Sequence, residues 1–505
     1  MIPAILALII SIGFFSAALL TVVVNNFFVV GNNVRSQQAF NIAEAGVNYY
    51  LWHMAHNGTD YKDGQTTPIT PDPTLGYGPY VHTYVDSNAQ QAGTFTLWIK
   101  PQGNGSTIAT VRSIGKVKDS KISRTVQAQI GAASFASYGL VSDQEFWFGN
   151  TESANGPIFS NVGIHMDGPN SDVVAAANAR YTPGGSYNGG VSGQQNGVWC
   201  NTAVISPSCL TRDKSNWLYP KPSVDFNQVS GSLCSMKKIA LNDNSATACT
   251  STPTTRTASY IPQYSTSGSF SVNRGYLLQL NTNNTYDLFK VSAENDTAAS
   301  YTAALTKTAV ATGIAVPANG VIFVEDNVWI RTNPTYHGRV TIASGRLATT
   351  YKTNITIADN VLYSVKDGSD AIGLVAENNI SIPPYAPPSS GAFTFEVNAA
   401  TLAQRGAVTW QQYYEGTNTC TKGWTASNQN FVYYGSVATR LNWTWNFSGG
   451  ACGNMVRDAI SGSYYSGIMR TATNYDYNLL YAPPPSYPVT GSYNILSWRE
   501  VLTRP

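Results

Sequence analysis

Charged side chains are scarce in this sequence. Asp, Glu, Lys and Arg make up 11% of its 505 residues, whereas an ordinary soluble domain has roughly 25%. The formal net charge is +2 and the basic residues do not cluster, so nothing indicates a nucleic-acid surface. An acidic substrate or an anionic membrane surface is not indicated either. With 43 Gly, 30 Tyr and 11 Trp, and many Ser, Thr and Asn, the composition is typical of a β-rich extracellular protein.

Histidine is also rare, with five in the chain, and no two cysteines have the Cys-x-x-Cys spacing. A zinc site is therefore not expected. The six cysteines can form three disulfides in fifteen ways, and we expect sequence neighbours to pair. The expected pairs are Cys200–Cys209, Cys234–Cys249 and Cys420–Cys452. Disulfides imply export from the reducing cytoplasm.

No charge precedes Arg35. The run from Met1 to Val24, MIPAILALIISIGFFSAALLTVVV, is predominantly apolar, and about 20 apolar residues suffice for a helix to cross a bilayer. A cleavable signal peptide would begin with Lys or Arg, and an ordinary anchor would carry flanking charges on its cytoplasmic side. Neither feature is present. We therefore expect that Met1 is a processed N-terminus, exposed by removal of a short basic leader.

Helical periodicity continues beyond the apolar run. Apolar residues recur at steps of mostly three or four, which predicts one helix from about residue 2 to 56, about 80 Å long. Its first part is apolar all round, and its second part has one apolar face. That face is expected to include Val30, Val34, Phe40, Ala43, Val47, Tyr50 and Met54. The first part needs lipid or other copies of itself around it, and the second needs a globular domain to lie on.

The stretch from Ser36 to Met54, SQQAFNIAEAGVNYYLWHM, resembles the N-terminal region of PilX-type pilins and related type IV pilin-like proteins. The segment from Ala43 to Gly46 matches the AEAG turn of that family. Classical pilins have a glutamate at the fifth mature position, thought to neutralise the amine of the neighbouring subunit. This chain has Ile5, so the resemblance implies a subunit that docks differently or takes a minor or tip position.

Four stretches then alternate between apolar and polar residues. They are YVHTYV from Tyr80, TFTLWIK from Thr94, STIATVRSIGKV from Ser106 and SRTVQAQIGA from Ser123. A period of two with short polar spacers predicts an antiparallel meander. We expect one face of this meander to cover the one-faced part of the helix.

A different pattern begins at Ser134. Later in the chain, four tracts share an apolar triplet, a polar corner and a further apolar step. Aligning their corners gives spacings of 18, 15 and 18 residues for Asp326, Ser344, Asp359 and Glu377. Such spacing indicates the rungs of a β-solenoid. The phrases NGPIFSN, GVIFVEDNVWI and AIGLVAENNISIP also resemble a β-helical domain found behind PilX-like N-termini in bacterial surface proteins, which implies an architecture and no activity.

The candidate catalytic and metal-binding residues have simpler interpretations. His53 and His56 lie three apart on the predicted helix, but no third ligand accompanies them. Glu325, Asp326 and Asp359 could serve a polysaccharide-cleaving site, yet their spread along the turns favours a role in turn geometry. No nucleophile elbow, phosphate loop or EF-hand motif is present. We expect no enzyme activity, no cofactor and no bound metal.

The sequence therefore predicts an α+β, mostly β fold. A long N-terminal hydrophobic helix and a small antiparallel-sheet pilin module precede a large β-solenoid head that resembles a parallel β-helix. The expected domains are the helix at 1–57, the meander at 58–133, a β-helix-like domain at 134–390 with a disulfide-containing insertion at about 170–315, and an aromatic-rich C-terminal β region and tail at 391–505.

The function expected from these features is that of a pilin, or minor or tip pilin, in a type IV pilus-like extracellular filament with an adhesive head. The implied partners are other pilins, a prepilin peptidase, assembly machinery in the cytoplasmic membrane and an unidentified surface ligand, with no nucleic acid. The residues expected on the filament or membrane helix are Met1, Ile5, Gly13, Ala17, Ala18, Val24, Phe27 and Glu44. Two alternatives stay open: a membrane-anchored β-helical adhesin that does not polymerise, and an exported glycan-processing enzyme.

Overall fold

The computed structural model describes residues 2–501 except for residues 57–59, 66–68, 102–107, 150–151, 154, 186, 202–208, 210–212, 265–269, 297, 299, 387–392, 412–428, 449–455, 458–463 and 469–470. The chain forms two compact units. Unit 1 comprises Met1–Gln102, Ile108–Gly131 and Tyr493–Pro505, and unit 2 comprises Gly103–Thr107 and Ala132–Ser492. The division expected from the sequence, with boundaries at residues 57, 133 and 390, stays a prediction.

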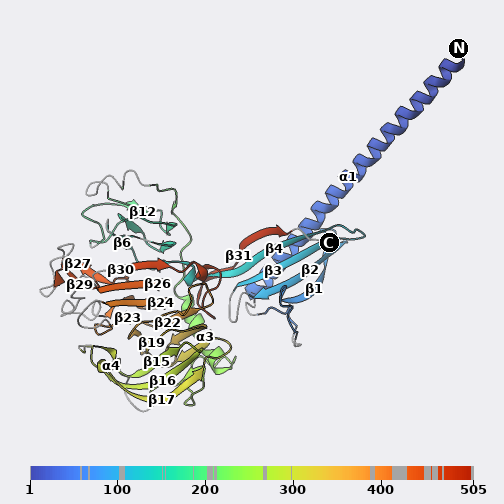
Figure 1. Ribbon diagram of the computed structural model, residues 1–505. Coiled ribbons are helices and arrows are strands. Elements are labelled where there is room, and N and C mark those ends of the chain that lie inside the picture. The colour runs from blue at the N-terminus through green and yellow to red at the C-terminus, as the bar shows by residue number, and fades with distance from the viewer. Residues whose placement is uncertain are drawn as a thin grey trace. The chain divides into compact units, whose positions relative to one another are not determined.

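Unit 1 is built on helix α1, Ile2–His56, which runs without a break for 55 residues (Figure 1). The predicted helix is thus confirmed. Its buried face starts later than predicted, because Val30 and Val34 are 58% and 51% exposed. The buried residues are Ala39, Ile42, Ala43, Val47, Tyr50 and Met54. The reason is the extent of the covering sheet, in which strand β3 (Ile108–Val117) ends soon after it meets the helix at Ala39.

The helix packs on one face of a five-stranded sheet in the order β1-β2-β3-β4-β31. Besides β3, these strands are β1 Tyr77–Val85, β2 Gln91–Pro101, β4 Ser123–Ser134 and β31 Val489–Val501. The first four form the predicted antiparallel meander. Their alternating residues Leu97, Val111 and Ala128 join the buried face of the helix in one core, as the period of two requires. The sequence did not predict that β31 would be the fifth strand of this sheet.

Within the described part of unit 2, the largest sheet has eleven strands, and all of its pairs are parallel. In order across the sheet they are β13 Trp217–Leu218, β9 Val174–Ala176, β7 Ile158–Ser160, β5 Leu140–Ser142, β26 Gln429–Thr439, β24 Phe393–Ala403, β22 Ala371–Ala376, β20 Arg339–Ser344, β18 Val321–Val324 and β14 Tyr260–Ile261. The eleventh strand is β30, Thr471–Tyr475, which pairs with β26 and is not part of this linear order.

A seven-stranded sheet carries the order β17-β16-β15-β19-β21-β23-β25. Its strands are β17 Leu305–Ala315, β16 Thr285–Glu294, β15 Gly275–Asn281, β19 Asn327–Asn333, β21 Ile355–Ile357, β23 Ile380–Ile382 and β25 Val408–Trp410. The pairs β15–β16 and β16–β17 are antiparallel, whereas β15, β19, β21, β23 and β25 run parallel.

Smaller sheets complete unit 2. Strands β6 Phe146–Phe148, β8 Ile164–Met166 and β12 Val198–Trp199 are parallel. Strands β10 Arg180–Tyr181 and β11 Gln195–Asn196 form an antiparallel pair. Strands β27 Asn446–Ser448, β28 Val456–Arg457 and β29 Tyr464–Gly467 form a third small sheet, which is antiparallel.

The eleven-stranded sheet is buried on both faces. Ile322 and Ile342 face the residues of the seven-stranded sheet, such as Ile355, in one core. On the opposite face, Phe323 packs with Leu233 of helix α3, Gln228–Leu241. Burial on both faces explains why strands such as VIFV and AIGLVA are continuous apolar runs rather than alternating ones.

Register corrects the expected alignment of polar corners. Val324 aligns with Ser344, and Ser344 aligns with Ala376. The corner residues that follow these parallel strands therefore lie together at the carboxyl ends of the strands of the eleven-stranded sheet. Asp359 follows β21, a strand of the seven-stranded sheet. The alignment of four equivalent corners was therefore wrong. The connections between strands differ in length, so similar spacing along the sequence does not mark equivalent positions.

The described part of unit 2 holds two disulfides, Cys200–Cys209 and Cys234–Cys249. Both are pairs of sequence neighbours, as expected. The second joins α3 to the segment that follows it, within the region expected to be an insertion. The third expected pair, Cys420–Cys452, lies outside the described residues.

Candidate functional site

The first part of α1 presents an uncovered apolar surface. The described side chains from Ile2 to Val30, residue 7 excepted, are exposed on every side of the helix, with Phe15 at 79% and Leu20 at 64%. This segment is long and apolar enough to cross a membrane, by length and composition. The predicted helix-contact residues in it are all exposed: Ile5, Gly13, Ala17, Ala18, Val24 and Phe27. Met1 lies outside the described residues.

Two hydroxyl groups in this part are satisfied within the helix. Ser11 donates to the Leu8 carbonyl at 2.9 Å, and Thr21 donates to the Ala17 carbonyl at 2.8 Å. Backbone groups are likewise paired inside the helix, which is the condition for lying in lipid or among other helices. The surface from Ile2 to Val24 is therefore suited to apolar surroundings.

The second part of α1 contacts the sheet so closely that glycine is required. A Cβ at Gly46 would overlap the Ser113 hydroxyl and come within 2.9 Å of the Phe95 ring. On the opposing strand, a Cβ at Gly115 would overlap backbone atoms of α1. Glu44 is half-buried on the same part of the helix. The glycine of the AEAG segment thus has a packing role.

Two carboxylates fix the end of α1. The Tyr50 hydroxyl donates to the Asp60 carbonyl at 2.7 Å, and His53 Nε2 lies 2.9 Å from Asp60 Oδ2. Similarly, His82 Nε2 of β1 lies 2.8 Å from Asp63 Oδ2, and the Tyr49 hydroxyl donates to Asp63 Oδ1 at 3.1 Å. These contacts tie the helix, the following loop and the sheet together.

The same contacts shift two pKa values. Burial acts to raise the pKa of Asp60, but hydrogen bonds from the backbone N–H groups of Lys62 and Gly64 outweigh it. The His53 ring adds to this effect, and the pKa of Asp60 falls below its usual value. Burial, together with the charge of Asp63, raises the pKa of Tyr49 to about 12.

The histidines considered as metal ligands have local partners. His53 contacts Asp60, and His56 Nδ1 lies 2.8 Å from the carbonyl oxygen of Trp52, one helical turn earlier. Within the described ranges, no group of three or more His, Cys, Asp and Glu side chains is arranged to hold a metal ion.

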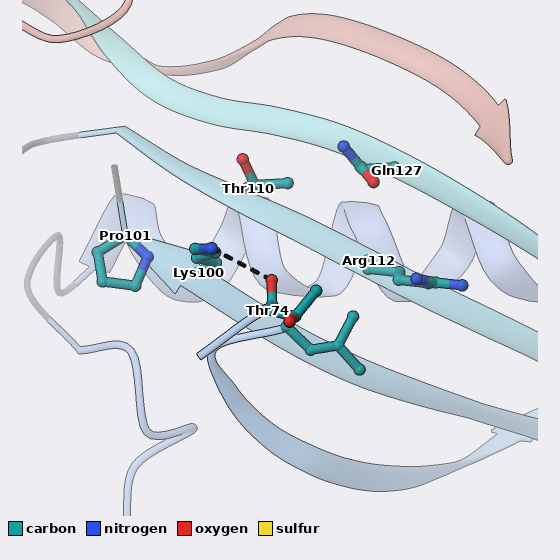
Figure 2. A pocket seen from close by; sticks show the side chains of 7 residues that line it. Thr74, Lys100, Pro101, Thr110, Arg112 and Gln127 are labelled. Carbon is teal, nitrogen blue, oxygen red and sulfur yellow. Dashed lines mark hydrogen bonds between the residues drawn. The ribbon is translucent and has the colours of Figure 1, made fainter. Parts of the chain in front are cut away.

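A pocket lies on the face of the sheet opposite α1. It has a volume of about 270 Å³ and is lined by Thr74, Leu75, Lys100, Pro101, Thr110, Arg112 and Gln127. Figure 2 shows the Thr74 loop in front of the strands that carry Lys100, Thr110 and Arg112. Lys100 Nζ donates to the carbonyl oxygens of Pro73 and Thr74 at 3.0 and 3.3 Å, which holds this loop beside β2.

Sequence reasoning missed this pocket. The register pairs Lys100 with Thr110 and Arg112 with Gln127 across neighbouring strands. The alternation within β2 and β3 could have placed both cations on the face away from the helix. No local signal in the sequence shows that the loop at Thr74 folds back onto that face.

The acidic residues considered for catalysis in unit 2 are paired. Buried Glu325 forms an ion pair with buried Lys237, which also donates to the Cys249 carbonyl at 3.2 Å. Asp326 accepts from Arg346 Nη2 at 2.9 Å. Asp359 Oδ2 lies 3.3 Å from Nη2 of Arg331, which belongs to β19 of the seven-stranded sheet. The three carboxylates neither converge nor line a described pocket.

Comparisons with known proteins do not assign the chain to a family. No family model matches the sequence, and no curated protein matches it. One similar solved structure is the crystal structure of the competence-associated pilin ComZ from Thermus thermophilus. It is 13% identical, and the match covers 93% of this chain and 98% of that chain with a TM-score of 0.26. A likeness at that TM-score supports no conclusion about fold or function.

Proposed function

We propose that the chain is a subunit of a type IV pilus-like extracellular filament. The observation that carries this proposal is the two-part helix α1. One unbroken helix of 55 residues is uncovered in its first part and packed on a small antiparallel sheet in its second. Such a helix can join a filament through one part while the other holds a globular unit.

The exposed apolar side chains in the first part of α1 are stable only where lipid or other protein shields them from water. Burying a Leu, Ile or Phe side chain contributes about 1.5–3 kcal/mol, and more than a dozen large apolar side chains between Ile2 and Val30 are exposed. Lipid can cover them before assembly, and the same part of other copies can cover them afterwards. Small residues at Gly13, Ala17 and Ala18 permit close approach between helices.

The proposal extends to the large β unit. Its parallel strands would form a β-solenoid that faces outward and contacts surfaces as an adhesive head. Disulfides such as Cys200–Cys209 suit an oxidising compartment outside the cytoplasm. We further propose a precursor inserted in the cytoplasmic membrane, a prepilin peptidase that processes it, and an assembly platform that supplies other pilins as partners.

A second candidate is a membrane-anchored adhesin that never polymerises. The same uncovered apolar helix supports it, since a single bilayer span needs about 20 apolar residues. The two candidates differ in whether the helix leaves the membrane. The enzyme alternative has less support, because its candidate acids Glu325 and Asp326 are buried in ion pairs.

Imaging of the cell surface tests the filament proposal. Phe27→Asp places a charge on the uncovered part of α1, where Phe27 is 74% exposed. Val81→Asp is the matched control, because Val81 is an exposed apolar residue of β1 at 64%. We expect filaments from wild type and V81D and none from F27D, although both variants accumulate. Filaments of normal number and length from F27D would contradict the proposal.

A further inference from the structure

Strands β1 to β4 of unit 1 carry cations but no acids, whereas β31 carries Glu500, which forms an ion pair with Arg124 of β4. Strands β1, β2, β3 and β4 contain no Asp or Glu at any position. Lys100, Arg112 and Lys116 alternate with the helix-facing residues of β2 and β3, so they belong to the opposite face. On β1 to β4 this face therefore carries only positive charge, and the pocket contains two of the three cations named.

Arg112 has a hydrogen-bond donor in need of a partner. Its Nε is shielded from solvent and has no acceptor among the described residues. An unpaired buried donor of this kind is uncommon in folded proteins, and Arg112 is one of the residues that line the pocket. Arg112 lies between Trp98 of β2 and Gln127 of β4 in the cross-strand register, and none of these neighbours carries a negative charge.

The acid of the neighbouring loop does not fill this role. Asp72 uses one carboxylate oxygen, Oδ1, to accept from the backbone N–H groups of Thr74 and Leu75 at 2.7 and 2.8 Å. That arrangement shapes the loop in front of the pocket, and Asp72 is not among the residues that line it. The lining combines two cations with hydroxyl and amide groups and has no carboxylate, although the nearby Asp72 carboxylate interacts with the charge of Lys100.

We propose that this pocket binds an oxyanion group, either a phosphate or a carboxylate. The Arg112 guanidinium is its main partner, because guanidinium donors match the oxygens of both groups. Lys100 adds positive charge at the loop, and the volume of about 270 Å³ admits a small anion. All of its residues belong to unit 1 and lie on the face of the sheet away from α1.

Ligand-observed NMR on the full chain in detergent tests this site. Inorganic phosphate is titrated against the protein while the ³¹P line width is followed, and acetate is then added as a competitor. The variants are Arg112→Gln and Arg112→Lys, of which the second keeps the charge but removes Nε. Lys116→Gln is the control, because Lys116 is exposed on the same face and does not line the pocket. Far-ultraviolet circular dichroism checks that each variant is folded.

Wild type and K116Q should broaden the phosphate line equally. R112Q and R112K should bind phosphate at least about tenfold more weakly, as expected for loss of a charge-assisted hydrogen bond. Displacement by acetate would assign carboxylates to the site as well, and failure of acetate to compete would restrict it to phosphate. Equal broadening by wild type and folded R112K, or no broadening by wild type, would overturn the proposal.

Discussion

Gly115 of β3 lies against the backbone of Ala43 in α1, in the middle of the contact between helix and sheet. A Cβ on Gly115 would overlap the Ala43 nitrogen and the carbonyl oxygen of Ala39. Because both of these atoms belong to the helix backbone, no side-chain rotation could make room. The separation of α1 from its sheet is therefore set by this glycine.

Replacing Gly115 with alanine should loosen unit 1. Overpacking of this kind costs about 1–3 kcal/mol, and the rigid helix backbone places the expected loss near the top of that range. Hydrogen–deuterium exchange of peptides from β2, β3 and β4 measures it. Gly13→Ala is the control, because nothing lies within 4 Å of a Cβ there. Unchanged exchange in G115A would refute the close contact.

The buried pair of Lys237 and Glu325 should be structural. Lys237→Met alone leaves a buried carboxylate without its partner, which costs about 3–5 kcal/mol. Adding Glu325→Met should restore most of the thermal stability, because an apolar pair replaces an ion pair. Thermal unfolding of the three proteins checks this. A glycan-cleaving activity that disappears in a stable E325Q variant would instead support catalysis.

Removal of the disulfide at α3 should destabilise unit 2. Cys234 and Cys249 are 15 residues apart, and a loop of that size contributes about 3 kcal/mol through the restricted unfolded chain. The variant Cys234→Ser/Cys249→Ser should therefore unfold at a lower temperature than wild type. Treating wild type with reductant should lower the melting temperature at least as much, because reductant also opens Cys200–Cys209. Equal melting temperatures would contradict the prediction.

The contact between Asp60 and the end of α1 should weaken in acid. Folding lowers the pKa of Asp60 below its usual value of 3.8, so the unfolded chain binds this proton more tightly. The stabilisation is therefore present above that usual value and is lost as the pH falls through the lower folded value. Asp60→Asn should be less stable than wild type at about pH 6, with a gap that narrows towards about pH 2. A stability difference between wild type and D60N that stays constant with pH, measured by hydrogen exchange across α1, would show that protonation of Asp60 does not weaken this contact.

Local patterns predicted the elements of unit 1 well. The charge-free run and the spacing from Phe40 to Met54 depend only on neighbours along the chain, and so does the alternation in β1–β4. The start of the buried face was misplaced at Val30 and Val34, because the sequence of a helix does not show where its covering sheet ends. Strand β31 was missed for a related reason, since its partner β4 lies more than 350 residues earlier.

Long-range placement also explains the errors in the candidate sites. Asp359 has the sequence context of a corner, but only strand register shows that it belongs to a different sheet from Asp326. Lys100 and Arg112 are ordinary residues of alternating strands until the loop at Thr74 folds across them. Chemistry that depends on loops and on pairing between distant strands has no signature within a short window.

Photo-crosslinking at Leu20 tests whether the first part of α1 packs against the helices of other copies in a filament. A benzophenone amino acid there sits on the uncovered part of α1, whereas the same probe at Tyr351, which is 52% exposed, serves as the control in unit 2. In material sheared from the cell surface and free of membrane, we expect crosslinks from position 20 to the helix of another copy and no such crosslinks from position 351. Recovery of position 20 only as uncrosslinked monomers, or only as lipid adducts in the membrane fraction, would contradict this expectation.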